Sequence, residues 1–148
     1  MTTKASAVVP VGLRCVRRNL GLEQQYIAAQ LDVAANTVSH WEHGYDNPPA
    51  HQMVAYAALV ERRLMVGRDR RGMYDLARLL PNLSTFRRVR KLTQQQVAHR
   101  MHVSVARVGV LERRARYRKP VGWDSVVRYF AALDYEIGIA KVQAARAA

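Results

Sequence analysis

Two stretches of this chain, seventy positions apart, have nearly the same pattern of residues. The first runs from Leu22 to Gly44 and the second from Leu92 to Arg114, and they align without a gap. A repeat constrains the fold more than any single motif does, because both copies must form the same supersecondary unit. The identical positions are Leu22/Leu92, Gln24/Gln94, Gln25/Gln95, Ala28/Ala98, Val33/Val103, Val38/Val108 and Glu42/Glu112.

Each copy has the periodicity of two short helices joined by a tight turn. In the first copy, apolar residues recur at helical spacing over residues 24–31 and again over 35–43. Between the helices, Asp32 in the first copy and His102 in the second stand where the turn requires a positive φ, and both residue types are enriched in that conformation. The helix–turn–helix is a common device by which small helical proteins place a helix in a DNA groove.

The flanking sequence completes two helical units of similar size. We expect an all-α fold with a first domain at residues 10–66, a polar, charged linker at 67–82 and a second domain at 83–142. Residues 53–64 are predicted to form the closing helix of the first unit. Alternating apolar residues over 135–142 are consistent with a short C-terminal strand, which would be the one β element and an exposed edge. Late in the units, the offset between the copies rises from 70 to 74 positions.

The net charge indicates a polyanionic partner. The chain carries 24 Lys and Arg against 11 Asp and Glu, a formal charge of +13. This charge is unevenly distributed, because residues 1–65 hold six basic and five acidic side chains, whereas residues 66–148 hold 18 basic and six acidic ones. Nearly all of the net positive charge therefore belongs to the second copy.

Several classes of function are disfavoured. No apolar run approaches the ~20 residues that cross a bilayer, and the single Cys15 excludes an intrachain disulfide, so we expect a soluble cytoplasmic protein without a membrane partner. We find no Gly-rich phosphate loop, nucleophile motif or paired catalytic carboxylates, and we expect neither an enzyme nor a cofactor. The pairs His40/His43 and His99/His102 lack further ligands, and no metal site is expected.

Both stretches resemble the XRE-type, lambda-repressor-like helix-turn-helix family of transcriptional regulators. The first copy departs from the family pattern at Glu23 and Asp32, and the second at His102, Gly109 and Arg114. The resemblance implies two tandem lambda-repressor-like helical bundles. The first copy keeps Leu22, Gln24, Ile27, Ala28, Leu31, Val33, Val38, Ser39, Trp41, Glu42, Gly44 and Pro48, and the second keeps Leu92, Thr93, Gln94, Val97, Ala98, Met101, Val103, Ser104, Val108, Leu111 and Glu112.

The resemblance also implies roles for individual residues. Gln24 and Gln94 open the first helix of each motif, where the side chain and the helix N-terminus approach a DNA phosphate. Two acidic residues resemble the family acid that pairs with an arginine of the preceding helix. These structural ion pairs would be Arg17 with Glu42 and Arg87 with Glu112.

In the first copy, the exposed face of the second helix has the chemistry of base readout. Asn36 can bond adenine through two hydrogen bonds, His40 can donate to guanine, and Ala35 or Thr37 can touch a thymine methyl group. Ser39 completes this face.

In the second copy, the corresponding face is mostly apolar, and two interpretations remain open. In the first, which we favour, Arg107 and Val110 contact bases weakly while a basic run grips phosphates. In the second, Val105 and Val110 are buried against a partner, giving a homodimer through this unit or the C-terminal segment. The favoured interpretation rests on the basic residues that directly follow this helix: Arg113, Arg114, Arg116, Arg118 and Lys119.

The leading hypothesis is a sequence-specific regulator of transcription that binds double-stranded DNA, a repressor of the phage, prophage or mobile-element type. Tandem units would replace the usual dimer and read an asymmetric site whose half-sites lie about 34 Å apart. One alternative is an antitoxin that binds a toxin partner and represses its own operon. The other is a nonspecific nucleoid or RNA-binding protein.

Overall fold

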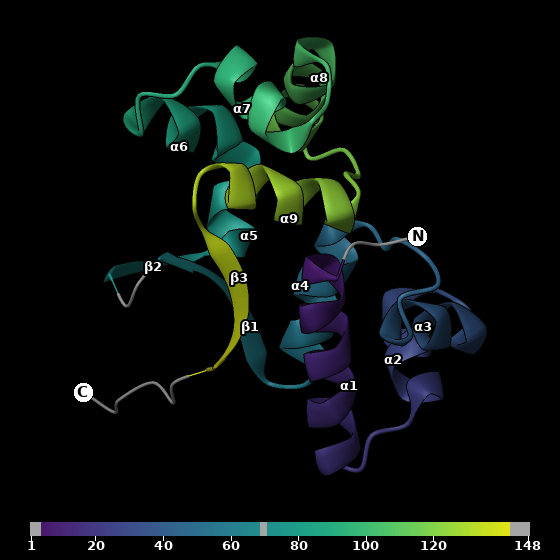
Figure 1. The fold of residues 1–148 in the computed structure, drawn as a ribbon. Coiled ribbons are helices and arrows are strands. Elements are labelled where there is room, and N and C mark those ends of the chain that lie inside the picture. The colour runs from purple at the N-terminus through teal and green to yellow at the C-terminus, as the bar shows by residue number, and fades with distance from the viewer. Residues whose placement is uncertain (1–3, 69–70, 143–148) are drawn as a thin grey trace.

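The computed structural model describes residues 4–68 and 71–142, which are mostly helical and carry a small sheet (Figure 1). The first half consists of η1 (Ala5–Ala7), α1 (Val8–Asn19), α2 (Gln24–Leu31), α3 (Ala35–Glu42), α4 (Ala50–Leu59) and β1 (Arg62–Arg68). It is followed by β2 (Arg71–Asp75), α5 (Leu76–Leu79), η2 (Leu80–Asn82), α6 (Leu83–Val89), α7 (Gln94–Met101), α8 (Val105–Arg116), α9 (Trp123–Ala132) and β3 (Glu136–Lys141). Within these described ranges, no helix is long and apolar enough to cross a bilayer.

Each of the two repeated stretches forms two helices joined by a tight turn, as predicted. Helix α2 ends at Asp32 with φ of 56°, and α7 ends at His102 with the same φ. The second segment has stronger helix caps, because Thr93 and Gln96 form a reciprocal capping box at α7 and Ser104 accepts a hydrogen bond from the Arg107 N–H at α8. The first segment has no side-chain cap bond at α2 or α3. Each such cap stabilises a helix by roughly 1 kcal/mol.

The described residues are mostly helical, as predicted, but they also form a three-stranded antiparallel sheet of order β2-β1-β3, which the expected all-α fold does not include. The predicted strand near the C-terminus is confirmed as β3, but it is not the one β element. The predicted helix over 53–64 instead ends at Leu59, and Glu61 takes a φ of 59°, which a helix cannot continue through. Leu64 and Val66 then bury alternate side chains in the manner of a strand.

The segment expected to be a linker, residues 67–82, contains the end of β1, the strand β2, helix α5 and η2. It packs against the second unit. The Tyr74 ring of β2 lies 5.5 Å from the Phe86 ring and 6.5 Å from the Tyr135 ring. The Arg90 guanidinium lies 5.5 Å from the centre of the Tyr74 ring, and Leu76 of α5 is fully buried. Some of these contacts, such as that of Tyr74 with Tyr135, join residues that are far apart in the sequence.

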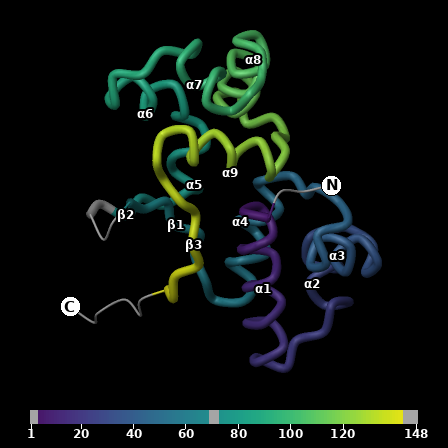
Figure 2. Tube along the Cα trace, viewed as in Figure 1, coloured from purple at the N-terminus to yellow at the C-terminus, as the bar shows by residue number. Residues whose placement is uncertain are grey.

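The later elements of the two copies also correspond, with an offset of 73 positions rather than the 74 predicted. Helices α4 and α9 each have ten residues, and Tyr56 of α4 corresponds to Tyr129 of α9. Both helices are followed by a residue with positive φ, Glu61 at 59° and Asp134 at 65°. The trace in Figure 2 follows α4 into β1 and α9 into β3, so each copy ends in a strand of the same sheet.

Candidate nucleic-acid interface

A buried polar cluster ties the helices of the first copy together. Arg17 of α1 donates from Nε and Nη2 to the two carboxylate oxygens of Glu42, at 2.8 and 2.9 Å. Gln24 of α2 donates to the same carboxylate at 2.9 Å, and the Tyr56 hydroxyl of α4 also donates to it. Arg17 Nη1 further donates to the Leu22 carbonyl at 2.8 Å. These contacts, the first clamp, fix α3 against α1, α2 and α4.

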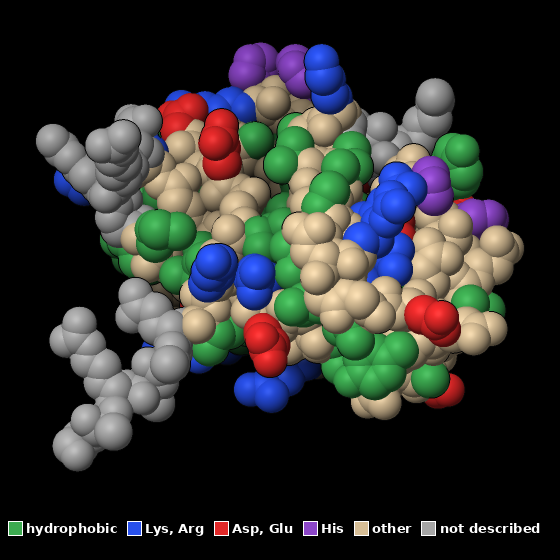
Figure 3. All heavy atoms as spheres, turned by 90° about the horizontal axis from the view of Figure 1, so that it is seen from below, with side chains coloured by type: hydrophobic (Ala, Val, Ile, Leu, Met, Phe, Trp, Pro, Cys, Tyr) green, Lys and Arg blue, Asp and Glu red, His purple; other side chains and the backbone are tan. Residues whose placement is uncertain are grey.

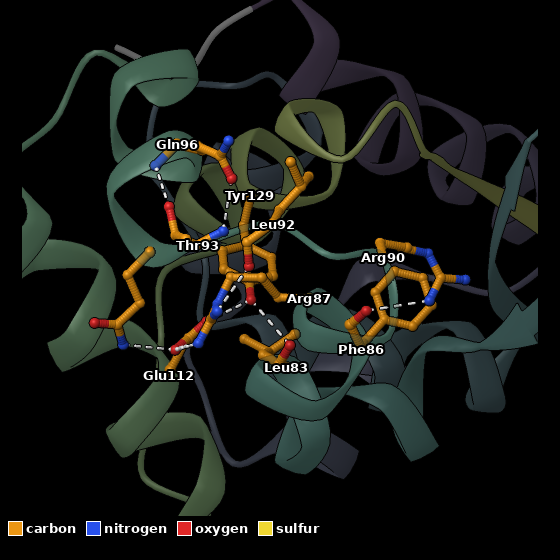
Figure 4. Close-up of polar contacts among 10 residues, drawn as sticks. Leu83, Phe86, Arg87, Arg90, Leu92, Thr93, Gln96, Glu112 and Tyr129 are labelled. Carbon is orange, nitrogen blue, oxygen red and sulfur yellow. Dashed lines mark hydrogen bonds and ion pairs between the residues drawn. The ribbon is translucent and has the colours of Figure 1, made fainter.

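The second copy repeats this cluster with residues of the same types at the equivalent positions (Figure 4). Arg87 donates from Nε and Nη2 to Glu112, at 2.7 and 3.2 Å, and from Nη1 to the Leu92 carbonyl at 2.9 Å. Gln94 and Tyr129 donate to the same carboxylate at 2.8 and 2.6 Å. We call this cluster the second clamp. Both ion pairs expected from the sequence are thus present, whereas the tyrosines were missed because they lie on the last helix of each unit.

Both clamp glutamates are held ionised. Burial alone would raise the pKa of Glu42, but hydrogen bonds from Arg17, Tyr56 and Gln24 outweigh burial and lower the pKa below its ordinary value. The pKa of Glu112 is lowered by the same balance. The clamps are therefore ion pairs at neutral pH, and each fixes the orientation of one exposed helix.

Gln24 and Gln94, the predicted phosphate contacts, are half-buried and belong to the clamps. One N–H of each side-chain amide is used by the glutamate. A primary amide carries two N–H groups, so each side chain keeps a second donor at the start of α2 or α7. The same side chain can thus orient the clamp and bind a phosphate.

The exposed face of α3 is polar, as predicted, and the structure adds an aromatic group at its end. Asn36 is exposed, and the other predicted readout residues are half-buried. His40 Nδ1 lies 2.9 Å from an Asp46 oxygen, so Nε2 is the ring nitrogen left for a base. The Tyr45 ring stacks on His43 at 5.6 Å and meets His40 edge-on at 5.8 Å. Sequence reasoning missed Tyr45 and Asp46, which lie in the loop after the helix. The half-buried readout residues are Ala35, Thr37, Ser39 and His40.

The corresponding face of α8 has a different chemistry. Arg107 and Val110 are exposed, as predicted, and they line an open groove of about 320 Å³ together with Ala106 and Arg114. Helix α8 continues to Arg116, so the basic run begins on the helix itself. All of its members are exposed: Arg113, Arg114, Arg116, Arg118 and Lys119.

The loop that follows α8 is held by one of these basic residues. Arg114 donates from Nε and Nη2 to the Pro120 carbonyl, at 3.1 and 3.0 Å. Arg118 has a φ of 57°, which turns the chain sharply toward Pro120. The basic loop therefore has a defined path, while the guanidinium of Arg116 and the ammonium of Lys119 remain at the surface.

The face where α1 and α2 lie carries side chains of several kinds. Figure 3 shows this face, the lower end of Figure 1, with basic, acidic and hydrophobic side chains interspersed. Val11, Leu20 and Tyr26 are among the exposed hydrophobic residues of these two helices.

Residues 13–63 match the family model described as Helix-turn-helix. The match covers about a third of the chain and includes most of α1, the helices α2, α3 and α4, and the whole first clamp. This segment therefore has the character of a DNA-binding domain of transcription regulators. Neither the comparison with curated proteins nor the comparison with solved structures finds a match.

Proposed function

We propose that this protein is a sequence-specific regulator of transcription that binds double-stranded DNA and represses by occupying a promoter. The observation that carries the proposal is the exposed polar face of α3, which the first clamp holds in a segment that matches the helix-turn-helix family. Asn36 is the residue best suited to read a base, because an exposed amide can bond both N6 and N7 of adenine.

The second unit supplies most of the binding charge in this proposal. Five exposed basic side chains lie on α8 and in the loop after it. Cations at such positions bind phosphates, which strengthens binding to every DNA sequence and makes it dependent on salt. The α8 face itself offers one side chain with strong hydrogen-bonding capacity, Arg107, so it contributes little to the choice of sequence.

A sequence-specific regulator differs from a nonspecific nucleic-acid binder in how strongly its affinity depends on the DNA sequence. Bound duplexes are selected from a random library, and the dissociation constants of the selected duplex and of a scrambled duplex are compared at about 150 mM salt. We expect the selected duplex to bind ~10³-fold more tightly or better. Equal affinities, or tighter binding of RNA of the same sequence, would overturn the proposal.

A further inference from the structure

The two copies contact each other through residues that are each other's equivalents. Pro49 in the first copy forms an antiparallel bridge with Gly122, which lies 73 positions later and is its equivalent. On either side, Ala50 N donates to the Val121 carbonyl at 2.8 Å and Trp123 N donates to the Pro48 carbonyl at 2.8 Å. Since Val121 and Trp123 are the equivalents of Pro48 and Ala50, exchanging the two copies exchanges these two hydrogen bonds.

The sheet has the same exchange symmetry at a second place. In the pairing of β1 with β3, Met65 faces Gly138, its own equivalent at the offset of 73. Leu64 faces Ile139 and Val66 faces Ile137. Ile137 is the equivalent of Leu64 and Ile139 that of Val66, so this contact also maps onto itself.

Two self-equivalent contacts define an approximate two-fold axis inside one chain. It passes near the Pro49–Gly122 bridge at one end and near the Met65–Gly138 pair at the other. Contacts that map onto themselves in this way are those of an isologous dimer, in which the same patch serves both partners. The covalent chain thus has the internal geometry of a homodimer.

Helices α3 and α8 are related by this axis. Each is followed by a loop that leads to the bridge at one end of the axis. The loop after α3 reaches Pro49, and the loop after α8 reaches Gly122. In Figure 1, both helices lie away from β1 and β3, the strands whose pairing marks the other end of the axis. A DNA duplex has two-fold symmetry of its own, and dimeric regulators align their axis with it so that equivalent helices enter successive turns of the major groove.

The symmetry of the contacts does not extend to the chemistry of the two faces. Asn36 and His40 lie on the face of α3, whereas the equivalent positions on α8 carry Ala106 and Val110. The loop after α3 carries Asp46, while the loop after α8 carries Arg118 and Lys119. A chain with these two faces matches a duplex whose two halves differ, not a palindrome.

We infer that a single chain occupies one duplex site composed of two unlike half-sites. Helix α3 reads the bases of one half, and α8 with its basic loop binds the phosphates of the other, about one helical turn or 34 Å away on the same face. The inference rests on the proposed function and adds the class of DNA site and the stoichiometry. No second chain is required to complete the site.

The first test is the composition of the complex. The full chain is mixed with a selected duplex, and the mass of the complex is measured by sedimentation or native mass spectrometry. We expect one chain per duplex and two protected segments centred about 10 base pairs apart in a hydroxyl-radical footprint. Two chains on one duplex, with a symmetric footprint, would overturn the inference while leaving the proposed function intact.

The second test is the length of the duplex. The selected duplex is cut back from the end bound by α8, so that the phosphates of that segment are removed while the segment read by α3 is kept. We expect the affinity to fall at least ~10-fold and the salt dependence to flatten, since the phosphate contacts of α8 are lost. Removal of flanking base pairs outside both protected segments is the matched control and should change nothing. An unchanged affinity for the duplex without the α8 segment would also overturn the inference, whereas loss of all sequence preference would overturn the proposed function itself.

Discussion

The two copies of the repeat share their interior contacts and differ in their exposed faces. Both contain the clamp of arginine, glutamine, glutamate and tyrosine with nearly the same geometry. At the surface, the α3 unit presents Asn36, His40 and the acid Asp46, while the α8 unit presents a run of basic residues. A buried charge tolerates no missing partner, whereas an exposed side chain contributes little to stability and can vary. The two copies therefore share the structure of the clamps, whereas their exposed faces differ in chemistry.

The largest expected effect is the loss of a clamp, which tests whether the interiors are equivalent. Glu42→Leu and Glu112→Leu each leave a buried arginine without its carboxylate. We expect each to lower the free energy of unfolding by ~3–5 kcal/mol, measured by urea denaturation. Glu136→Leu, which removes an exposed carboxylate from β3, is the control and should change it by no more than ~0.5 kcal/mol. A loss below about 1 kcal/mol at one clamp alone would show that the two interiors are not equivalent, and so small a loss at both would show that neither clamp stabilises the fold.

The same clamps predict a pH dependence of stability. Because the pKa values of Glu42 and Glu112 are lowered from 4.5, their contribution is complete above that pH and is lost as the pH falls through the lowered values. We therefore expect the free energy of unfolding to be nearly constant between about pH 5 and pH 7, where both carboxylates are ionised. Below about pH 5 we expect it to decrease. The double variant Glu42→Gln/Glu112→Gln should show a shallower decrease in acid. An equally steep decrease would assign the acid sensitivity to other groups.

Reading by α3 is tested with Asn36→Ala. We expect this change to reduce discrimination at one base pair of the site by ~1–3 kcal/mol and to leave the other positions unaffected. Binding to a panel of duplexes with single substitutions measures the effect. Asn19→Ala removes an exposed amide from the last residue of α1 and serves as the matched control. Uniform weakening on every duplex would mean that Asn36 contacts the backbone instead.

Phosphate binding by the α8 unit is tested with Arg116→Ala/Arg118→Ala. Each lost phosphate contact should change the slope of log K against log salt by ~0.9, so the slope should flatten by roughly two. The control is Arg63→Ala/Lys141→Ala, which removes two exposed charges from β1 and β3. A slope that flattens equally in both variants would show that the effect belongs to net charge and not to this site.

The smallest expected effect concerns Gly109, in the middle of α8. A Cβ built at this position would meet Gln94 at 3.8 Å, an ordinary packing distance. Gly109→Ala should therefore stabilise the protein by ~1 kcal/mol through helix propensity alone, measured by thermal or urea denaturation. The corresponding Ser39→Ala in α3 is the comparison and should give a smaller gain. Destabilisation by Gly109→Ala would mean that Gln94 cannot accept the methyl group.

Local sequence patterns predicted the helices and turns well, because helical periodicity and the need for positive φ at Asp32 and His102 are properties of a few neighbouring residues. The strand β1 was missed for the opposite reason. It follows an Ala-rich helix without Gly or Pro between them, and its pairing partner β3 lies some seventy residues away. Sheet pairing at that separation leaves almost no local signal.

Part of the candidate site could likewise be predicted from the sequence, and part could not. The ion pairs Arg17–Glu42 and Arg87–Glu112 followed from the family resemblance, but Tyr56 and Tyr129 come from helices outside the repeated stretch. The bridge between Pro49 and Gly122 had no sequence signal, because it depends on how the two copies pack. The approximate two-fold axis could therefore be recognised only in three dimensions.

The central claim is that α3 reads one half of the site while α8 holds the other. A scan that substitutes every base pair of the selected duplex, with binding measured for each substitution, tests it most directly. We predict that the substitutions costing ~1–3 kcal/mol fall within a single protected segment, and that Asn36→Ala abolishes part of that cost, while the other segment tolerates substitution. Two segments of equal sensitivity, or a sensitive segment whose discrimination depends on Arg107 and not on Asn36, would contradict it.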